Sequence, residues 1–349
     1  MTVRSGAISM RQVAERAGVS PATVSRVLTG APTVRDTYRS RVLAAVAELD
    51  YRPNRLARNL RRQKVDMIGV VVSDIENPHF SEAVRAVEDA AYRRGYRLLL
   101  CNTDETAAKQ RTYLQMLAEE RVLGVIVAPS DPDGAEISEL LDLGIPVVAF
   151  DRTVTDERAD AVVADNVGGV RTATEHLLAA GHRRVGFIAG LSEVETGVER
   201  LEGYTAAMDA AGLEPLVAPG RFRIEAGRAA TRALMARATP PTALVACNNL
   251  TAIGALRALR EAGLAVPREV ALVAVDDPFW AELVDPPLTT VDQPVRAMAD
   301  EAMSLLLERI EGRRREPRRV VFPLELRRRR SCGTSSHGTE PDRWRASGS

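Results

Sequence analysis

The sequence predicts an α/β protein in which a small helical head precedes a two-lobed core of parallel sheets. Three observations support this fold class. The 349 residues are 45% hydrophobic and 27% charged, which can supply packed cores for two or three domains. From residue 65 onward, short apolar runs alternate with amphipathic helical segments. Residues 1–64 carry 13 basic and four acidic side chains, so a head of net charge +9 precedes a body of net charge −9.

The head is predicted to contain three helices. Ser9 can cap a helix over 10–17, and Gly18 ends it at a position that suits a positive φ. A second helix follows over 21–28 and a third over 37–49. Two short helices joined by a glycine turn form a helix-turn-helix, whose second helix enters the major groove of DNA. A small helical subdomain with a solvated basic face is the alternative, and the net charge of +9 favours DNA. The side chains expected to face inward are Val13, Ala14, Ala17, Val24, Val27, Leu28, Tyr38, Val42, Ala45, Val46 and Leu49.

Several phrases in and after the head are typical of one family. They are Val13-Ala14, Ala17-Gly18-Val19-Ser20, Thr23-Val24-Ser25-Arg26-Val27-Leu28, Glu48-Leu49-Asp50-Tyr51-Arg52-Pro53-Asn54 and Ala57-Arg58-Asn59-Leu60. This pattern resembles the Lac repressor family of bacterial transcriptional regulators. The resemblance implies a DNA-binding domain over 8–52, a hinge helix over 53–64, and an effector-binding and dimerising core over 65–330. One departure is Gln12, where the family often has Asp, and it is expected to matter little on a helix surface.

The resemblance assigns base reading to Pro21, Ala22 and Arg26 of the second helix. Arg26 can donate a bidentate pair to guanine, worth about 1–3 kcal/mol of discrimination. Ala22 offers only an apolar contact and Pro21 has no side-chain donor, so specificity depends mainly on Arg26. Ser25 and Thr29 are expected to assist. The phosphate-contacting residues that the resemblance implies are Ser9, Ser20, Thr23, Thr33, Tyr51 and Asn54.

Residues 53–62 are a candidate for a basic helix that is too short to be stable alone in water. A flexible arginine-rich linker is the alternative in the free protein. In the family, this segment folds on operator DNA and two copies insert a leucine pair into the minor groove; the matching residues are Ala57 and Leu60. Such an apolar wedge kinks pyrimidine–purine steps most easily. We therefore expect a homodimer on a near-palindromic double-stranded operator with a central CG step.

The body is predicted to fold into two lobes. Seven apolar runs are expected to form buried strands: Met67–Val72, Leu98–Cys101, Val122–Ala128, Pro146–Phe150, Val185–Ala189, Thr242–Ala246 and Val270–Val275. Helices are expected over His79–Arg94, Ala107–Glu120, Gly134–Leu143, Val167–Ala180, Val198–Ala211, Glu225–Ala236 and Leu250–Ala262, and several end at glycines, namely Gly95, Gly144, Gly181, Gly212 and Gly263. A last helix over Val295–Ile310 and a strand over Val320–Leu326, with solvated arginines, are left to return to the first lobe. Lobe 1 would then hold about 65–162 and 292–330, lobe 2 about 163–291, and a disordered tail would cover 332–349.

The body also resembles the periplasmic-binding-protein-like core of the same family, on phrases such as Asn77-Pro78-His79-Phe80 and Phe150-Asp151-Arg152. Ligands bind such folds in the cleft outside the carboxyl ends of the strands. Asp151, Asn248 and Asp276 follow predicted strands, although a carboxylate there can also cap a helix or lie on the surface. Carboxylate, amide and guanidinium groups suit a ligand rich in hydroxyl or amide groups. The expected effector-binding residues are Phe80, Asp151, Arg200, Phe222, Asn248 and Asp276, and weaker candidates are Asp74, His79, Val194, Thr196 and Trp280.

The effector implied by the resemblance is a sugar or sugar derivative, and a nucleoside or purine is the alternative. A further departure is Asn249, where the family usually has Asp. The expected mechanism is linkage: an effector that binds one conformation of the cleft better changes hinge-helix pairing, and thereby the affinity for the operator. Inducer release is the commoner behaviour in the family, and corepression also occurs.

Two other function classes fit the sequence less well. A solute-binding protein would account for the body but not for the basic head, and residues 1–20 contain no secretory apolar region, so we expect a cytoplasmic protein. An enzyme is disfavoured because GxSxG and P-loop motifs are absent, and GxGxxG does not follow the first strand. Three distant cysteines form no CxxC or Cys/His cluster, so we expect no metal site and no cofactor. No apolar run reaches the ~18 residues of a membrane span.

Overall fold

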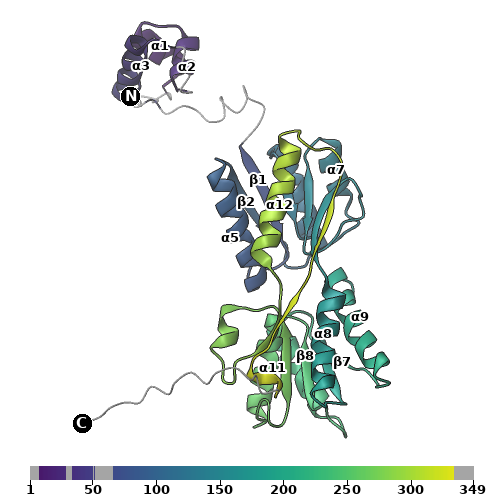
Figure 1. The fold of residues 1–349 in the computed structure, drawn as a ribbon. Helices are drawn as coiled ribbons and strands as arrows, with labels where there is room; N and C mark the ends of the chain where they lie inside the picture. The colour runs from purple at the N-terminus through teal and green to yellow at the C-terminus, as the bar shows by residue number, and fades with distance from the viewer. Residues whose placement is uncertain (1–7, 29–33, 50, 52–65, 334–349) are drawn as a thin grey trace, which may run out of the picture. The chain divides into compact units, whose positions relative to one another are not determined.

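The computed structural model describes residues 8–28, 34–49, 51 and 66–333. Contacts divide the chain into two compact units, Met1–Val65 and Asp66–Ser349 (Figure 1). The predicted hinge helix and tail lie outside the described residues. The same is true of five predicted DNA-contacting residues, namely Thr29, Thr33, Asn54, Ala57 and Leu60.

The first unit contains three helices: α1 (Met10–Ala17), α2 (Pro21–Leu28) and α3 (Asp36–Glu48). Gly18 has a φ of +61°, a backbone conformation that L side chains rarely adopt, so the turn between α1 and α2 favours glycine. The prediction that Tyr38 faces inward is wrong, because it is 39% exposed and the burial of α3 begins one turn later, at Val42. The small core consists of Val13, Ala14, Ala17, Val24, Val27, Val42, Ala45 and Tyr51.

Lobe 1 of the second unit has a six-stranded sheet in the order β11-β5-β4-β3-β1-β2, with all strands parallel. The strands are β1 (Met67–Val72), β2 (Arg97–Asn102), β3 (Val125–Val127), β4 (Val147–Phe150), β5 (Asp160–Ala164) and β11 (Arg319–Phe322). The helices are α5 (Pro78–Arg93), α6 (Ala107–Glu119), α7 (Ala135–Asp142) and α12 (Val295–Ile310).

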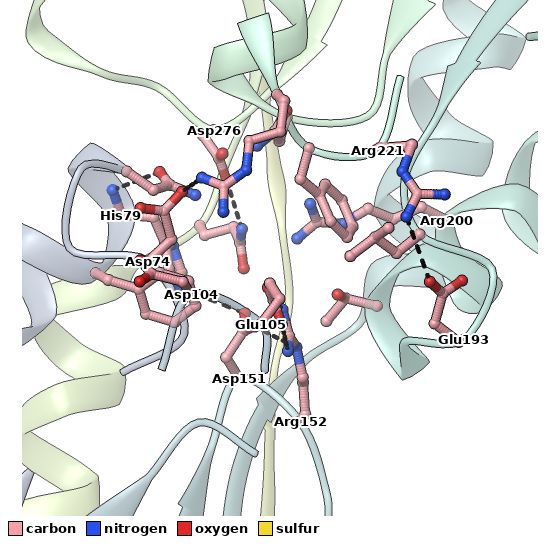
Figure 2. A pocket seen from close by; sticks show the side chains of 18 residues that line it. Asp74, His79, Asp104, Glu105, Asp151, Arg152, Glu193, Arg200, Arg221 and Asp276 are labelled. Carbon is pink, nitrogen blue, oxygen red and sulfur yellow. Dashed lines mark hydrogen bonds and ion pairs between the residues drawn. The ribbon is translucent and has the colours of Figure 1, made fainter. Parts of the chain in front are cut away.

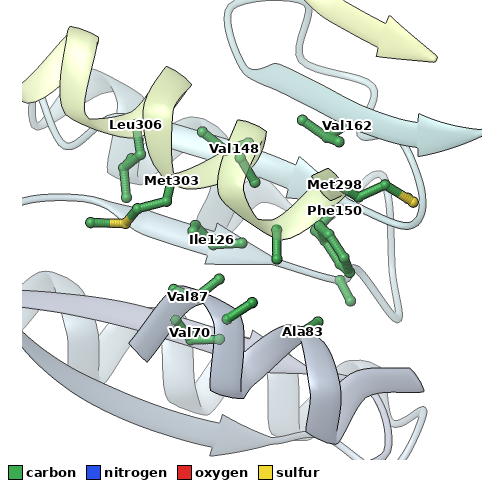
Figure 3. Close-up of a cluster of buried hydrophobic side chains, with 14 of the residues drawn as sticks. Val70, Ala83, Val87, Ile126, Val148, Phe150, Val162, Met298, Met303 and Leu306 are labelled. Carbon is green, nitrogen blue, oxygen red and sulfur yellow. The ribbon is translucent and has the colours of Figure 1, made fainter. Parts of the chain in front are cut away.

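Successive side chains of these strands pack on opposite faces of the sheet, as a pleated strand requires. Val70 and Ile126 belong to the cluster that α5 and α12 cover, and Figure 3 shows them between these helices and the strands. Val71 and Val127 belong to the opposite cluster, beneath α6 and α7. Because both faces are covered, the strands are nearly continuous apolar runs.

Lobe 2 has a second six-stranded sheet, in the order β12-β10-β9-β8-β6-β7, in which only β12 is antiparallel to its neighbour. The strands are β6 (Val185–Ala189), β7 (Leu216–Pro219), β8 (Ala243–Ala246), β9 (Ala271–Val275), β10 (Thr289–Asp292) and β12 (Glu325–Arg327). The helices are α8 (Asn166–Ala179), α9 (Glu195–Ala210), α10 (Ile224–Met235) and α11 (Asn249–Glu261), with short 3-10 turns η1 (Phe279–Glu282) and η2 (Arg330–Cys332).

The seven strands predicted in the body and its predicted helices are all present, and the five glycines expected after helices all have a positive φ. The strand predicted over Val320–Leu326 is wrong. Pro323 has no N–H for a ladder, so the run divides there into β11 in lobe 1 and β12 in lobe 2. Lobe 1 therefore does not extend to residue 330, and its strand β5 crosses the predicted boundary at 162.

The sequence predicts solvated arginines in this last segment, but several of them form ion pairs. Arg314 Nη1 lies 2.8 Å from Asp160 Oδ1, and the Asp160 side chain is fully buried. Arg309 Nε lies 3.0 Å from Asp160 Oδ2. Arg329 pairs with Asp277 at 2.7 Å. These pairs fasten residues 309–329 to both lobes.

Candidate functional site: the interlobe cleft and the helix-turn-helix face

A cavity of about 240 Å³ lies between the two lobes, at the carboxyl ends of the strands of both sheets (Figure 2). All six predicted effector-binding residues line it: Phe80, Asp151, Arg200, Phe222, Asn248 and Asp276. Three of the weaker candidates, Asp74, His79 and Thr196, also line it, whereas Val194 and Trp280 do not. The lining residues that sequence reasoning missed are Asn77, Asp104, Glu105, Arg152, Leu191, Glu193, Arg221, Arg223 and Gln293.

Backbone strain is concentrated around this cavity. In the described part of the chain, seven residues other than glycine have a positive φ, and six of them line the cavity: Asp104, Glu105, Asp151, Arg221, Phe222 and Asp276. Asp151 follows β4 with a φ of +68°, and Asp276 follows β9 with a φ of +73°. Such conformations cost about 1–3 kcal/mol each and are typical of binding sites. Among the described helices neither residue is an N-cap, so the capping alternative is excluded.

A buried ion pair lies on the lobe 1 side. His79 Nε2 is 3.4 Å from Asp151 Oδ1, and both side chains are almost fully buried. Burial lowers the pKa of His79, but the Asp151 carboxylate outweighs it and raises this pKa above its usual value. Burial raises the pKa of Asp151, but His79 and Arg152 outweigh it and hold that pKa at about 2. Arg152 is itself fixed by two hydrogen bonds of 2.6 Å to Glu105.

Arg200 presents a buried cation from α9. Its Nε donates to Asn166 Oδ1 and its Nη1 to the carbonyl oxygen of Cys247, both at 2.8 Å. Its guanidinium carbon lies 6.0 Å from the centre of the Phe222 ring. No carboxylate among the described residues forms an ion pair with it, although it is only 4% exposed. The acceptors that hold Arg200 are neutral, so its charge remains available to a ligand.

Asp276 receives three hydrogen bonds from neutral donors. Asn249 donates to Oδ2 from its backbone N–H at 3.2 Å and from Nδ2 at 2.8 Å. Gln293 Nε2 donates to Oδ1 at 2.6 Å. Asn248, one residue earlier, caps α11 by accepting a hydrogen bond from the backbone N–H of Thr251. Asp276 and Asn248 are thus held in place by lobe 2 and by Gln293, which lies between β10 of lobe 2 and α12 of lobe 1.

Buried polar atoms without a hydrogen-bond partner also gather here. In the described part of the chain they are Ser73 Oγ, His79 Nδ1, Asn248 Nδ2, Asn249 Oδ1 and Gln293 Oε1. His79 Nε2 and Arg152 Nε also lack a hydrogen bond, but each lies 3.4 Å from a carboxylate oxygen of Asp151 and is paired with it. All except those of Ser73 and Asn249 belong to side chains that line the cavity. Buried polar groups are almost always paired in folded proteins. A mixed set of open donors and acceptors therefore suits a ligand that both donates and accepts hydrogen bonds.

Three polar contacts join the lobes around the cavity. Asp74 of lobe 1 pairs with Arg223 of lobe 2. The Thr153 backbone N–H and hydroxyl donate to the Glu195 carboxylate at 2.5 and 2.9 Å. Asn249 Nδ2 of lobe 2 also donates to Asn77 Oδ1 of lobe 1 at 2.8 Å. The described conformation is therefore one in which the lobes are held together by side chains.

The second candidate site is the outer face of α2 in the head. Pro21, Ala22 and Arg26 are exposed there, and Thr23 and Ser25 are half-buried. Ser20 Oγ accepts a hydrogen bond from the backbone N–H of Thr23 at 3.2 Å and so caps the start of α2.

The other predicted head residues have structural roles of their own. Ser9 forms a capping box with Gln12, which lies exposed on the helix surface as expected; the effect of Gln12 in place of Asp stays a prediction. Tyr51 is only 7% exposed and packs in the core of the head. Its predicted phosphate contact stays a prediction.

Known proteins share both parts of this architecture. Residues 9–54 match the bacterial regulatory proteins of the lacI family, and residues 174–332 match a periplasmic binding protein-like domain. The HTH-type transcriptional regulator CelR of Thermobifida fusca is 38% identical over 333 residues, covering 93% of this chain and 98% of the relative. The HTH-type transcriptional repressor PurR of Photobacterium profundum is 35% identical over 331 residues, again covering 93% of this chain and 98% of the relative. The chain belongs to the lacI family.

Solved structures agree with this assignment. A complex of the transcriptional regulator CelR with cellobiose has a TM-score of 0.71 and 36% identity, covering 93% of this chain and 99% of that one. The Lac repressor dimer bound to operator and the anti-inducer ONPF has a TM-score of 0.83 and 28% identity, covering 94% and 99%. This lacI-family chain is a DNA-binding transcriptional regulator with a helix-turn-helix head and a two-lobed periplasmic-binding-protein-like core. None of the helices in the described residues is long and apolar enough to cross a membrane.

Proposed function

We propose that this regulator is a repressor that binds a palindromic operator as a homodimer. A sugar or sugar derivative that fills the interlobe cleft lowers or raises its affinity for the operator. The observation that carries the effector proposal is the set of buried, open donors and acceptors around the cavity, beside the buried Arg200 and Asp276. Hydroxyl groups both donate and accept, so a polyhydroxylated ligand can satisfy this set.

The lining favours a carbohydrate over a nucleoside or purine. Asp151 and Asp276 can accept only, and Arg200 can donate only, which suits hydroxyl groups arranged around a small ring. Phe80 and Phe222 supply apolar walls for the ring's carbon face. A similar regulator has been solved with cellobiose, which supports the same ligand class. A nucleoside or purine is the second candidate.

The homodimer is supported by exposed apolar side chains on both lobes. In lobe 1, Tyr92 is 77% exposed and Leu100 of the edge strand β2 is 42% exposed. In lobe 2, Phe279 is 81% and Leu283 is 76% exposed. Large apolar side chains and an open sheet edge are typical of surfaces that a second subunit covers. The similar Lac repressor structure is a dimer on its operator.

Effector binding in the cleft and operator binding by the heads would be coupled by thermodynamic linkage. A ligand that binds the lobe arrangement described here better than another arrangement shifts the population toward it by that difference in affinity. The lobe arrangement then sets how the two heads and hinge segments meet the half-sites. No catalytic step is needed, and its relatives are transcriptional regulators.

Calorimetric titration tests the effector class. Cellobiose, ribose, other neutral mono- and disaccharides, nucleosides and purine bases are added to the purified protein. Binding of a sugar that is lost in Arg200→Ala and kept in Arg26→Ala is the expected result, because only the first substitution alters the cleft. Binding of a purine or nucleoside and of no sugar would replace this proposal with the second candidate.

A further inference from the structure

Asn249 is the point at which the Asp276 carboxylate and the opposite lobe meet. Its Nδ2 donates at 2.8 Å to Asp276 Oδ2, within lobe 2, and at 2.8 Å to Asn77 Oδ1, in lobe 1. Asn77 Oδ1 in turn accepts the backbone N–H of His79 and so caps α5. One amide group is therefore shared between an expected effector contact and the first turn of a helix in the other lobe.

The orientation of this amide is fixed by its surroundings. Both neighbours of Nδ2 are oxygen acceptors, so the flipped amide would place Oδ1 against two oxygens. Asn249 is 1% exposed, and its Oδ1 has no partner in the described residues. The side chain thus leaves one buried acceptor open in order to donate to both partners.

We propose that Asn249 is a positioning residue of the cleft, whose uncharged amide holds the Asp276 carboxylate and ties it to Asn77 of the other lobe. The position of the Asp276 carboxylate and the closure of the two lobes are then coupled through the Asn249 amide. The inference deepens the proposed function, since it assumes that Asp276 receives an effector. It also explains why the departure from the family's usual Asp matters: a carboxylate at 249 cannot donate to either partner.

An Asp at this position has a measurable consequence. Asn249→Asp would put a carboxylate oxygen about where Nδ2 lies, 2.8 Å from Asp276 Oδ2. Repulsion between two carboxylates at this spacing raises the pKa of one of them, so the folded variant keeps a proton that the unfolded chain releases near pH 4. The pKa of the carboxyl pair is raised by folding. Stability relative to wild type is therefore kept at low pH and lost as the pH rises.

The closing experiment uses the full-length protein without any effector. Urea unfolding of wild type, Asn249→Asp, Asn249→Ala and Asn248→Asp is followed from pH 5 to 7 at one protein concentration. We expect the unfolding equilibrium constant of Asn249→Asp to rise relative to wild type by about tenfold per pH unit, until the pair is fully ionised. Asn249→Ala loses both hydrogen bonds and should show a ratio that does not change with pH. Asn248→Asp is the matched control, because it places its negative charge at the N-cap of α11, where the helix N-terminus stabilises a negative charge.

Other titratable and charged groups face this pair, and their interactions with one another are common to every variant and cancel in the ratio to wild type. Their interactions with the new carboxylate at 249 do not cancel, so they contribute to the measured pH dependence. Around the two cavities that Asp276 lines, these groups are Asp74, His79, Glu82, Asp104, Glu105, Asp151, Arg152, Glu193, Arg200, Arg221, Arg223, Asp277 and Asp292. An Asn249→Asp ratio that is flat with pH would overturn the placement of Asn249 beside Asp276.

A double-mutant cycle tests the tie between the lobes. Asn77→Ser keeps a capping oxygen for α5 but is too short to reach Asn249. We expect the combined effect of Asn77→Ser and Asn249→Ala to be smaller than the product of the single effects by about threefold or more. Independent effects would reject the tie. Because no ligand is involved, absence of sugar binding would overturn the proposed function and leave this result standing.

Discussion

The buried pair of His79 and Asp151 yields a quantitative prediction for Asp151→Asn. The ordinary pKa of Asp is 3.8, and the cleft holds that of Asp151 at about 2. Each pKa unit corresponds to 1.36 kcal/mol, so this carboxylate contributes about 2 kcal/mol to the stability of the wild type at neutral pH. Asp151 is 6% exposed, so solvent screening hardly reduces this value.

The sign of the pH dependence follows from the lowered pKa. A carboxyl group with a lowered folded-state pKa stabilises the protein above its ordinary pKa, and this contribution is lost as the pH falls from about 4 toward 2. Asp151→Asn should therefore be less stable than wild type by about 2 kcal/mol at pH 7, and the gap should narrow below pH 4. Urea unfolding at a fixed protein concentration measures it.

The same substitution should reverse the direction of the His79 shift. Without the Asp151 charge, burial dominates and the pKa of His79 should fall below 6.5, whereas in wild type it lies above. An NMR titration of the histidine rings measures the pKa of His79 in wild type and in Asp151→Asn. Asp142→Asn, which removes an exposed carboxylate of lobe 1, is the matched control and should change neither quantity. An unshifted His79 pKa and an unchanged stability in Asp151→Asn would refute the reasoning.

Three further predictions concern DNA, effector and fold. Arg26→Ala should weaken specific binding by about 1–3 kcal/mol per half-site while salt-dependent nonspecific binding remains, as measured by DNA titrations at several salt concentrations. Asp276→Ala should abolish the effector response and leave the DNA footprint intact; a lost footprint with an unchanged response would show that the cleft is misplaced. Asp160→Asn should reduce the free energy of unfolding by about 3–5 kcal/mol, because it leaves Arg309 and Arg314 facing a neutral side chain in a buried site; a small loss would contradict this.

Local patterns were sufficient for most of the fold. Buried parallel strands are apolar on both faces, so runs such as 67–72 and 271–275 are visible without any structure. Strands β7 and β10 were missed because β7 alternates between buried and exposed residues and β10 begins with two threonines, so neither is a continuous apolar run. The sequence does carry a signal for β5, whose residues 161–164 are apolar and buried. The division at Pro323 depends on which lobe each half meets, which is a property of the tertiary fold.

The cleft was predictable only in part. Asp151 and Asp276 directly follow strands and Asn248 comes two residues after one, so their position on the chain indicates their place in the cleft. Arg152 and Glu105 come from different loops, and their bidentate pair depends on how those loops fold. The double role of Asn249 could not be predicted either, because Asn77 is far away in sequence and belongs to the other lobe.

The central claim is that this regulator reads an operator under the control of a ligand in its cleft. Selection of bound fragments from a random double-stranded DNA library, at one fixed salt concentration, tests it most directly. The selection is run with the protein alone and with pooled sugars and nucleosides. We predict a palindrome with a central CG step whose enrichment differs between the two arms and is lost in Arg26→Ala. Failure to enrich any site in either arm would contradict the account.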